Sequence, residues 1–316
     1  LPNSHPMKTL WIESGKDKMS LQSIKHSDCI TTTTPKLAKT FGNFNDNVNI
    51  FPNQFDWDLP QWNYDKNEVR KEMLGDWFPT DDKIIIGWAG LTSHFEDIKR
   101  MAPIMKAIHD KYPNTHFVLA GMALKDTAVE ITEDEHGNKK FEEKEIEDKS
   151  QTYKGRIEAL FADIDPNRMK IFDALPLEEY GKFYALYDIS MAYIEHNTFA
   201  SCKSEIKVVE SARYGCIPVF SNFGGYKTMA DQVPSNISLK GFAIDYTTPK
   251  AWINAISSHI DNYDETKKRA LEFKEWSDSN YNINNHAEDR LSFYLRNAEE
   301  FHEDWYNQNI AQNMDY

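Results

Sequence analysis

The sequence predicts an α/β fold built on a parallel, doubly wound sheet, and three observations indicate this class. Six apolar runs of strand length recur from residue 80 onward, at residues 83–90, 116–122, 169–175, 188–194, 216–221 and 241–246. A helical hydrophobic period precedes or follows each run, as in βαβ units. The runs are almost continuously apolar, which is typical of parallel strands buried on both faces. Six such strands make a complete Rossmann-like domain.

Size and charge limit the classes of function. With 316 residues, 40% of them hydrophobic, the chain can bury one large core or two modest ones, as an enzyme-sized globular protein does. The net charge of −14 argues against nucleic acid or an anionic membrane as a partner, because both require a positive field. No apolar run approaches the ~20 residues of a membrane span. We therefore expect no nucleic-acid partner and no integral membrane segment.

The cysteines indicate the compartment. Cys29, Cys202 and Cys216 have no metal-ligand spacing, and three cysteines cannot all pair with one another. This pattern favours a reducing environment. We expect a cytoplasmic protein with no metal site.

A shorter unit precedes the six strands. Residues 28–42 predict a strand, then a brief helix with Thr34 as N-cap, Pro35 at its first position and Gly42 at its end. A second strand follows in residues 47–58.

The first crossover of the main sheet begins at Gly90 and a Thr-Ser-His turn. Ser93 and Glu96 have the spacing of a capping box, which predicts Ser93 as the N-cap. We expect a kink or break of the following helix at Pro103. The turn therefore predicts a helix N-terminus at the carboxyl edge of the sheet, where ligands of open α/β sheets bind.

Residues 125–152 interrupt the alternation of strands and helices. Their charged sequence predicts a solvated two-stranded hairpin that turns at residues 136–138, inserted at the edge of the sheet. An interaction surface is the alternative interpretation of this segment. Beyond residue 250 the chain is helical and aromatic.

The richest segment is 197–221, in which a short helix lies between two strands. We expect Ser204 to cap this helix and Gly215 to end it. The first free backbone N–H groups of the helix would then attract an anion such as a diphosphate, together with two lysines. The residues concerned are Lys203, Glu205, Ile206 and Lys207. Glu210 follows Lys207 at i,i+3, where a carboxylate can bind hydroxyls of the same ligand; an exposed Lys207–Glu210 ion pair is the alternative.

This segment resembles the donor-site signature of group 1 retaining glycosyltransferases with the GT-B fold. Glu210 takes the position of the glutamate that binds the nucleotide ribose, ahead of Gly215 and Pro218. The common motif has a second glutamate where this chain has Cys202, so the acid at the reaction centre stays unassigned. One branch lacks that glutamate and reads N-x-F-N-x-x-K-S-x-x-K-x-x-E. Its positions match Asn197, Phe199, Lys203, Ser204, Lys207 and Glu210, but Ala200 replaces the second Asn.

The opening loop of the donor domain in the same branch resembles residues 90–98. Its pattern G-x-x-S/T-H-x-x-D-L matches Gly90, Ser93, His94 and Asp97, with Ile98 in place of Leu. The resemblance implies that His94 contacts the sugar or phosphate; an ordinary solvated residue in a first helical turn is the alternative.

The resemblance implies a domain order. Residues 1–79 would be a remnant of the amino-terminal acceptor lobe with the interdomain crossover, 80–250 the donor-binding domain, and 251–316 helices that brace the two lobes. The expected donor-binding residues are Gly90, Ser93, His94, Lys203, Ser204, Glu205, Ile206, Lys207 and Glu210. Lys207 is the best candidate for stabilising the leaving group.

The implied function is a hexosyltransferase-like enzyme of glycan biosynthesis. It would move a sugar from a nucleoside diphosphate sugar to a hydroxyl of a glycan or other acceptor, with retention and without metal or cofactor. Two alternatives remain open at this stage: a non-catalytic GT-B-like binding module, and the donor-binding subunit of a split enzyme whose acceptor lobe is a separate chain. The short amino-terminal unit implies that the enzyme is incomplete as this chain. The base, sugar and acceptor stay open.

Overall fold

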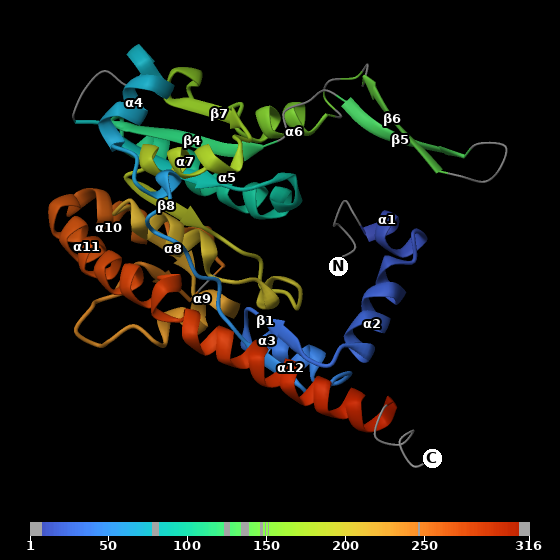
Figure 1. Cartoon of the computed structure of the whole chain (residues 1–316). Helices are drawn as coiled ribbons and strands as arrows, with labels where there is room; N and C mark the ends of the chain where they lie inside the picture. The colour runs from blue at the N-terminus through green and yellow to red at the C-terminus, as the bar shows by residue number, and fades with distance from the viewer. Residues whose placement is uncertain are drawn as a thin grey trace, which may run out of the picture.

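The computed structural model describes residues 8–77, 82–122, 127–133, 139–145, 148, 150, 152–245 and 247–309. One six-stranded parallel sheet organises the fold, and Figure 1 shows it at the centre of the molecule. Its strands in chain order are β3 (Ile84–Ala89), β4 (Thr115–Met122), β7 (Met169–Asp173), β8 (Ile189–Ala192), β9 (Ile217–Ser221) and β10 (Ala243–Ile244). All six predicted runs contribute a strand, and the predicted fold class is confirmed.

The strand order across the sheet is β10-β9-β8-β3-β4-β7. This order is that of the classical doubly wound fold, in which the first strand lies in the middle and the chain proceeds outward in both directions. Every residue of β3, β4, β8 and β9 is buried. Burial on both faces explains why these strands are continuously apolar rather than alternating.

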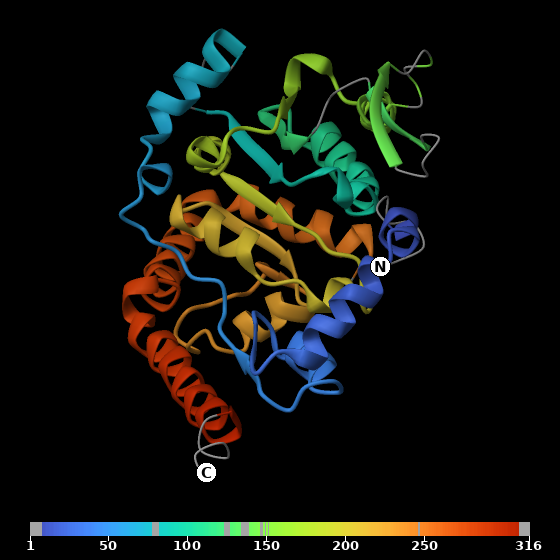
Figure 2. The same ribbon diagram turned by 45° about the vertical axis from the view of Figure 1, so that its right-hand side comes forward.

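Helices cover both faces of the sheet. α5 (Phe95–Lys111) follows β3 and packs against α10 (Pro249–Asp261). α7 (Gly181–Leu186) and α8 (Ile206–Arg213) contact each other, and α8 packs on α11 (Tyr263–Asn280). Two shorter helices, α6 (Tyr153–Leu160) and α9 (Gly224–Ala230), complete the crossovers. Figure 2 shows the sheet from another direction with helices on its two sides.

The start of α5 differs from the prediction. Thr92–His94 form a 3₁₀ turn, and the helix begins at Phe95 with His94 as N-cap and no side-chain cap bond. The capping box of Ser93 and Glu96 is therefore wrong, because the 3₁₀ turn already carries the backbone into the helix. The helix also continues through Pro103 without a break. Pro103 lies on the exposed face, where water can bond to the carbonyl that proline leaves without a donor.

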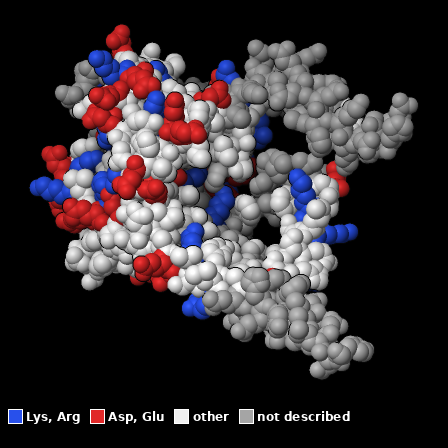
Figure 3. Space-filling model, viewed as in Figure 1, with Lys and Arg blue, Asp and Glu red and all other residues white. Residues whose placement is uncertain are grey.

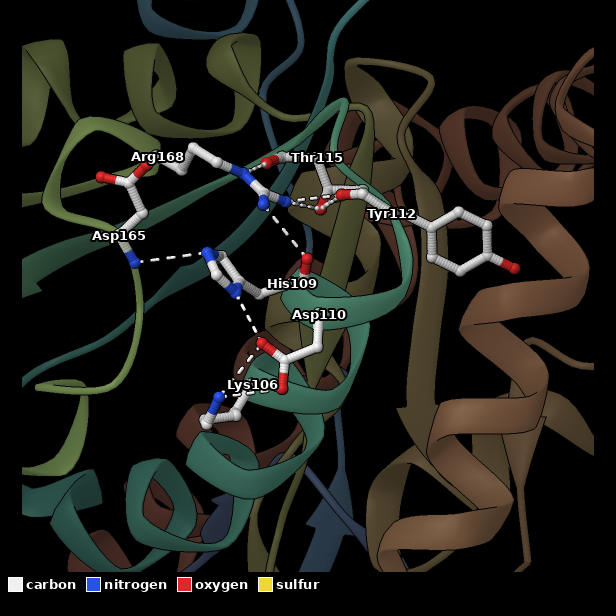
Figure 4. Close-up of polar contacts among 7 residues, drawn as sticks. All are labelled: Lys106, His109, Asp110, Tyr112, Thr115, Asp165 and Arg168. Carbon is white, nitrogen blue, oxygen red and sulfur yellow. Dashed lines mark hydrogen bonds and ion pairs between the residues drawn. The ribbon is translucent and has the colours of Figure 1, made fainter.

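The end of α5 is fastened by Arg168, which lies in a 3₁₀ turn, Pro166–Arg168, just before β7. Figure 4 shows its guanidinium group among the carbonyl oxygens of the last helical turn and the start of β4. Arg168 donates to the carbonyl oxygens of His109 at 3.1 Å, Tyr112 at 2.5 Å and Thr115 at 2.8 Å. The carbonyl groups that a helix end leaves unpaired thus obtain donors.

The amino-terminal unit contains α1 (Lys8–Glu13), α2 (Lys16–His26), β1 (Ile30–Thr32), α3 (Pro35–Phe41) and β2 (Val48–Ile50). β1 and β2 pair in parallel as a separate two-stranded sheet. The hydroxyl of Thr34 caps α3 by accepting from the backbone N–H of Leu37 at 3.3 Å, and Gly42 follows the helix. The predicted Thr34, Pro35 and Gly42 positions are confirmed. α4 (Lys66–Leu74) then leads into the main sheet.

The long carboxyl-terminal helix α12 (Ala287–Asn309) runs back along the amino-terminal unit (Figure 1). Asn47 donates to Asn297 at 2.7 Å, and the rings of Phe51 and Phe293 pack edge to face at 5.3 Å. The carboxyl-terminal helices therefore connect the two ends of the chain.

The insertion contains an antiparallel hairpin of β5 (Thr127–Glu133) and β6 (Lys139–Glu145), which projects from the body of the protein in Figure 1. The expected turn at residues 136–138 lies outside the described residues. Elsewhere on the surface, acidic and basic side chains mix on the face drawn in Figure 3. Among the described residues, no helix combines the length and apolarity that crossing a membrane requires.

Candidate functional site

A crevice is expected between β3 and β8, where the winding of the sheet changes direction. The crossover from β3 to β4 uses α5, and the crossover from β8 to β9 uses α8 on the opposite face. Ligands of open α/β sheets bind outside the carboxyl ends of the strands at this point. The turn that holds Gly90 and His94 follows β3, and the segment that holds Lys203 and Lys207 follows β8. The two turns meet at one edge of the sheet, as predicted.

Gly90 and Lys207 are in direct contact. A Cβ atom added to Gly90 would lie 2.6 Å from the Nζ atom of Lys207 and 2.6 Å from the Trp88 ring. Any larger side chain at position 90 would therefore displace the ammonium group or the ring. The Lys207 Nζ atom lies 4.4 Å from the centre of the Trp88 ring. It is buried, and no described residue hydrogen-bonds to it.

The electrostatics of Lys207 follow from this position. Burial is the main cause that lowers its pKa to about 7; the carboxylates of Asp97 and Glu210 oppose this shift, and the charge of Lys203 adds to it. An unpaired buried ammonium group is unfavourable, because it has lost its water without gaining a partner. The position is therefore suited to receive an anion.

His94 lies beside this group and is held by Asp97. Its Nδ1 atom is 2.6 Å from Oδ2 of Asp97 and 3.3 Å from Nζ of Lys203. A carboxylate only accepts, so Nδ1–H donates to Asp97, and the Lys203 contact is electrostatic rather than a hydrogen bond. Burial, with Lys207 as the next cause, lowers the pKa of His94 to about 4. The imidazole is thus neutral at pH 7, and its Nε2 atom is an acceptor.

Asp97 also connects the segment after β3 with the segment after β8. Its Oδ1 atom accepts the backbone N–H of Glu195 at 3.0 Å, so the start of α5 is joined to the segment after β8.

Glu210 is buried one helical turn beyond Lys207. Its Oε2 atom accepts from the hydroxyl of Tyr184 at 2.7 Å, and Tyr184 lies 3.3 Å from the hydroxyl of Tyr180. Burial raises the pKa of Glu210 to about 7, against the opposing effects of the Tyr184 bond and Lys207. The alternative of an exposed Lys207–Glu210 ion pair is wrong, because both charged groups are buried and Nζ of Lys207 bonds to no acceptor.

The other predicted residues lie at the edge of this arrangement or apart from it. Ser93 is exposed in the 3₁₀ turn, and Ile206, half-buried, is the first residue of α8. Ser204 does not cap α8: the helix begins two residues later, and the Ser204 hydroxyl accepts from the side-chain amide of Asn53 at 2.8 Å. This contact with the amino-terminal unit replaces the expected capping bond.

Glu205 differs most from expectation. Burial raises the pKa of its carboxyl group, and the neighbouring Tyr281 hydroxyl and its own backbone N–H oppose that shift. The side chain lines a small cavity of about 60 Å³ with Thr34, Pro52 and Gly225. It therefore lies between α9 and the amino-terminal unit rather than with Gly90 and Lys207.

Cys202 is half-buried, and its Sγ atom lies 3.4 Å from the carbonyl oxygen of Thr198. Within the described ranges, no three His, Cys, Asp or Glu side chains gather in a way that could hold a metal ion.

Two residues of the site were missed by sequence reasoning. Trp88 lies under the Lys207 ammonium group, and Tyr184 holds the Glu210 carboxylate. Both belong to ordinary apolar segments, a strand and a helix, so their residue type gave no sign of a contact with α8. The position of Trp88 just before the Gly90 turn is the one signal that was present.

The sequence matches no protein-family model and none of the curated proteins. The fold matches solved structures. Sucrose-phosphate synthase from Thermosynechococcus elongatus superposes with a TM-score of 0.60 at 13% identity, over 92% of this chain and 66% of that one. The Anabaena protein HepE, in complex with UDP and glucose, gives 0.59 at 15% identity, over 87% and 66%. A glycosyltransferase from Rickettsia africae gives 0.58 at 13% identity, over 94% and 68%.

These similarities establish the fold. The chain has the GT-B glycosyltransferase architecture, as the sequence predicted, with an amino-terminal unit much smaller than the part that contains the six-stranded sheet. It spans 66% of the length of each of the first two proteins, so about a third of each has no counterpart here.

Proposed function

We propose that the chain is the donor-binding half of a retaining, metal-independent glycosyltransferase that moves a hexose or similar sugar from a nucleoside diphosphate sugar to an acceptor hydroxyl. The observation that carries this proposal is the buried Lys207 ammonium group, which has no hydrogen-bond partner and lies against Gly90. A diphosphate would supply the missing acceptors. HepE was solved with UDP and glucose, and starch synthase IV from Arabidopsis thaliana with ADP and acarbose, which supports a nucleotide as the ligand.

The chemistry that this arrangement supports is stabilisation of the leaving group. As the bond between sugar and diphosphate breaks, negative charge develops on the diphosphate. Lys207 and Lys203 would stabilise that charge in a position shielded from water, where an electrostatic interaction is strongest. Positive charge from two lysines does the work that a divalent cation does at other diphosphate sites, which is the basis for proposing metal independence.

Separate groups would bind the nucleoside and the sugar. Glu210 keeps one carboxylate oxygen bonded to Tyr184, and we assign its other oxygen to the hydroxyls of the ribose. His94 is neutral and held by Asp97, so its Nε2 atom can accept from a hydroxyl of the sugar.

A binding experiment with pairs of nucleotides tests these assignments separately. Thermal shift and calorimetry measure the affinities of four pairs of nucleotides for Lys207→Met and Glu210→Gln. Each pair is the monophosphate and the diphosphate of one base: UMP and UDP, GMP and GDP, AMP and ADP, dTMP and dTDP. A nucleotide at 100 times its Kd should add about 2.7 kcal/mol to the free energy of unfolding. We expect Lys207→Met to weaken the diphosphate about 10- to 100-fold and the monophosphate much less, because one charge-assisted bond contributes about 1.5–3 kcal/mol.

Glu210→Gln should weaken the binding of the monophosphate and of the diphosphate by the same factor, since both contain the ribose. Lys99→Met is the matched control, because Lys99 is exposed on α5. Variants of Lys207 and Glu210 that bind every nucleotide like the parent would show that the donor site is misassigned.

A second candidate function is a GT-B-like module that binds a nucleotide or glycan without turnover. The observation that favours it is Cys202, which stands where the common motif has an acid and whose thiol makes a weak contact with the carbonyl oxygen of Thr198. Release of free sugar from the best-binding UDP-sugar distinguishes the two: slow hydrolysis indicates an active donor site, and binding without hydrolysis indicates the module.

The acceptor site and the compartment belong to the same proposal. A second lobe, on further residues or on a separate chain, would hold a glycan or other acceptor opposite Gly90 and His94. The thiols of Cys29, Cys202 and Cys216 are all free, which supports a cytoplasmic location.

A further inference from the structure

The partner of the Lys207 ammonium group is an aromatic ring. Trp88 is completely buried at the end of β3, and the face of its ring lies 4.4 Å from Nζ of Lys207. The edge of the same ring packs against Gly90, and His94 contacts it at 5.8 Å between ring centres. The indole N–H also lacks a hydrogen-bond partner.

Four other polar groups face Lys207, and none of them bonds to its Nζ atom. Asp97 and His94 approach from the start of α5, Lys203 from the segment after β8, and Glu210 from the next turn of α8. The two carboxylates bond instead to His94, Glu195 and Tyr184. The two carboxylates therefore act on the ammonium group through charge alone, whereas the face of the Trp88 ring packs against it at 4.4 Å.

A ring and a carboxylate hold a lysine in different ways. The negative face of an indole ring attracts a cation but does not accept its N–H groups as strongly directed bonds. A carboxylate would occupy those N–H groups and would repel an incoming diphosphate. A ring therefore favours the charged form of a lysine and leaves its N–H groups available to a ligand.

We propose that Trp88 is a positioning residue for donor binding: its ring holds the Lys207 amino group at Gly90, with the N–H groups unbonded, until a nucleoside diphosphate arrives. The inference rests on the proposed donor site and assigns to it a residue that works through the charge of Lys207.

The test varies the electrostatics of the ring at constant shape. Fluorinated tryptophans are placed at position 88 by nonsense suppression, because each fluorine makes the ring face less negative while its size changes little. The Kd of UDP is then measured by calorimetry from pH 6 to pH 9. We expect UDP binding at pH 7.5 to weaken stepwise with fluorination, about 5- to 30-fold across the series, and the pH at which affinity falls to move down by about half to one unit.

Trp88→Phe and Trp88→Leu extend the series, with folding checked by urea titration. The expected order of affinity is Trp, Phe, Leu, and the pH midpoint follows the same order. Combining the fluorinated series with Lys207→Arg is the decisive control, because a guanidinium stays protonated throughout this range and the midpoint should no longer move.

Affinity that weakens equally at every pH, or that ignores fluorination, would overturn the proposal and leave Trp88 as a packing residue. Should Trp88→Leu fail to fold, the fluorinated series decides alone. The donor assignment is checked in the same experiment, because an unsubstituted protein that binds no nucleoside diphosphate contradicts the proposed function itself.

Discussion

Lys207 and Glu210 lie one turn apart on α8, and burial shifts their pKa values toward each other. It lowers the pKa of Lys207 to about 7 and raises that of Glu210 to about 7. Both groups therefore change charge near neutral pH, whereas an exposed lysine and glutamate would be fully charged there. A ligand that brings negative charge to Lys207 stabilises its protonated form and raises its pKa.

This shift predicts proton uptake on donor binding. In the free protein at pH 8, one unit above the pKa, about nine tenths of Lys207 is deprotonated. A bound diphosphate raises the pKa, so UDP binding at pH 8 should take up close to one proton, and affinity should fall as pH rises above about 7. Calorimetry in buffers with different ionisation enthalpies measures the uptake.

The control is Lys207→Arg, which is protonated before and after binding and should reduce the uptake to near zero. A parent protein that binds UDP at pH 8 without taking up a proton would contradict the contact between Lys207 and the diphosphate.

Single residues of the site were predictable where a short local pattern carries the chemistry. Gly90, His94, Lys203, Lys207 and Glu210 lie in two turns whose residue types suit an anion and a sugar. Trp88 and Tyr184 were not predictable in this way, because each acts on a side chain more than twenty positions away that only the folded sheet brings near.

At the scale of elements, α5 is fixed at both ends by side chains from other segments. Asp97 in its first turn bonds to the segment after β8, and Arg168 binds the carbonyl groups of its last turn (Figure 4). The Asp97 bond lies at the same edge of the sheet as the candidate site. The Arg168 bonds lie at the opposite end of α5.

Substitution of Arg168 should therefore affect stability and not binding. Arg168→Lys keeps the charge but cannot reach three carbonyl groups with one ammonium, so we expect the free energy of unfolding to fall by about 1.5–3 kcal/mol. Urea unfolding measures the loss, and the Kd of UDP should stay unchanged. Arg296→Lys, on the exposed side of α12, is the matched control and should change stability by less than about 0.5 kcal/mol. A large change in Kd with Arg168→Lys would show that the two ends of α5 are coupled.

The period of apolar residues predicted that these strands and helices exist, but local residue patterns did not always predict where the helices begin. Both serine N-caps, Ser93 and Ser204, fit the local pattern and are wrong. In one case a 3₁₀ turn precedes the helix, and in the other Asn53 takes the hydroxyl. Thr34 and Pro35 were correct, because the Thr34 hydroxyl donates to the carbonyl oxygen of Cys202 and can still accept the backbone N–H of Leu37. Helix starts are thus decided by tertiary contacts as much as by propensity.

At the scale of the whole molecule, the two parts of the chain differ greatly in size. Among the described residues, the amino-terminal unit holds two strands of three residues each, whereas the rest of the chain contains the six-stranded sheet. Domains typically need about 100–150 residues, and the reaction centre of the proposed enzyme lies between two lobes.

We therefore expect this chain to bind donor and to transfer sugar poorly without a further lobe. Orientation of the acceptor accounts for as much as about 7–11 kcal/mol of a bimolecular barrier, and that contribution requires a surface that holds the acceptor. The chain is incubated with its best-binding UDP-sugar and a broad acceptor panel, and transfer is compared with hydrolysis. Adding a Rossmann-like acceptor lobe in trans should raise transfer specifically. Efficient acceptor-dependent turnover by residues 1–316 alone would contradict the expectation.

The pairing of β3 with β8 also affects the order in which the sheet can form during synthesis. The backbone N–H of Ile85 bonds to the Asp188 carboxylate across 103 positions of sequence, and β3, β4 and β7 are all complete before β8 leaves the ribosome. Until then the inner edge of β3, every residue of which is buried in the finished protein, has no neighbour. Such an edge is a template for wrong pairing, and chains grow at about 5–20 residues per second. The incomplete sheet must avoid pairing with other copies of the chain until β8 is made. A nucleotide bound at the proposed site would stabilise the chain only afterwards, because β8 both covers this edge of β3 and leads into the segment that holds Lys203 and Lys207.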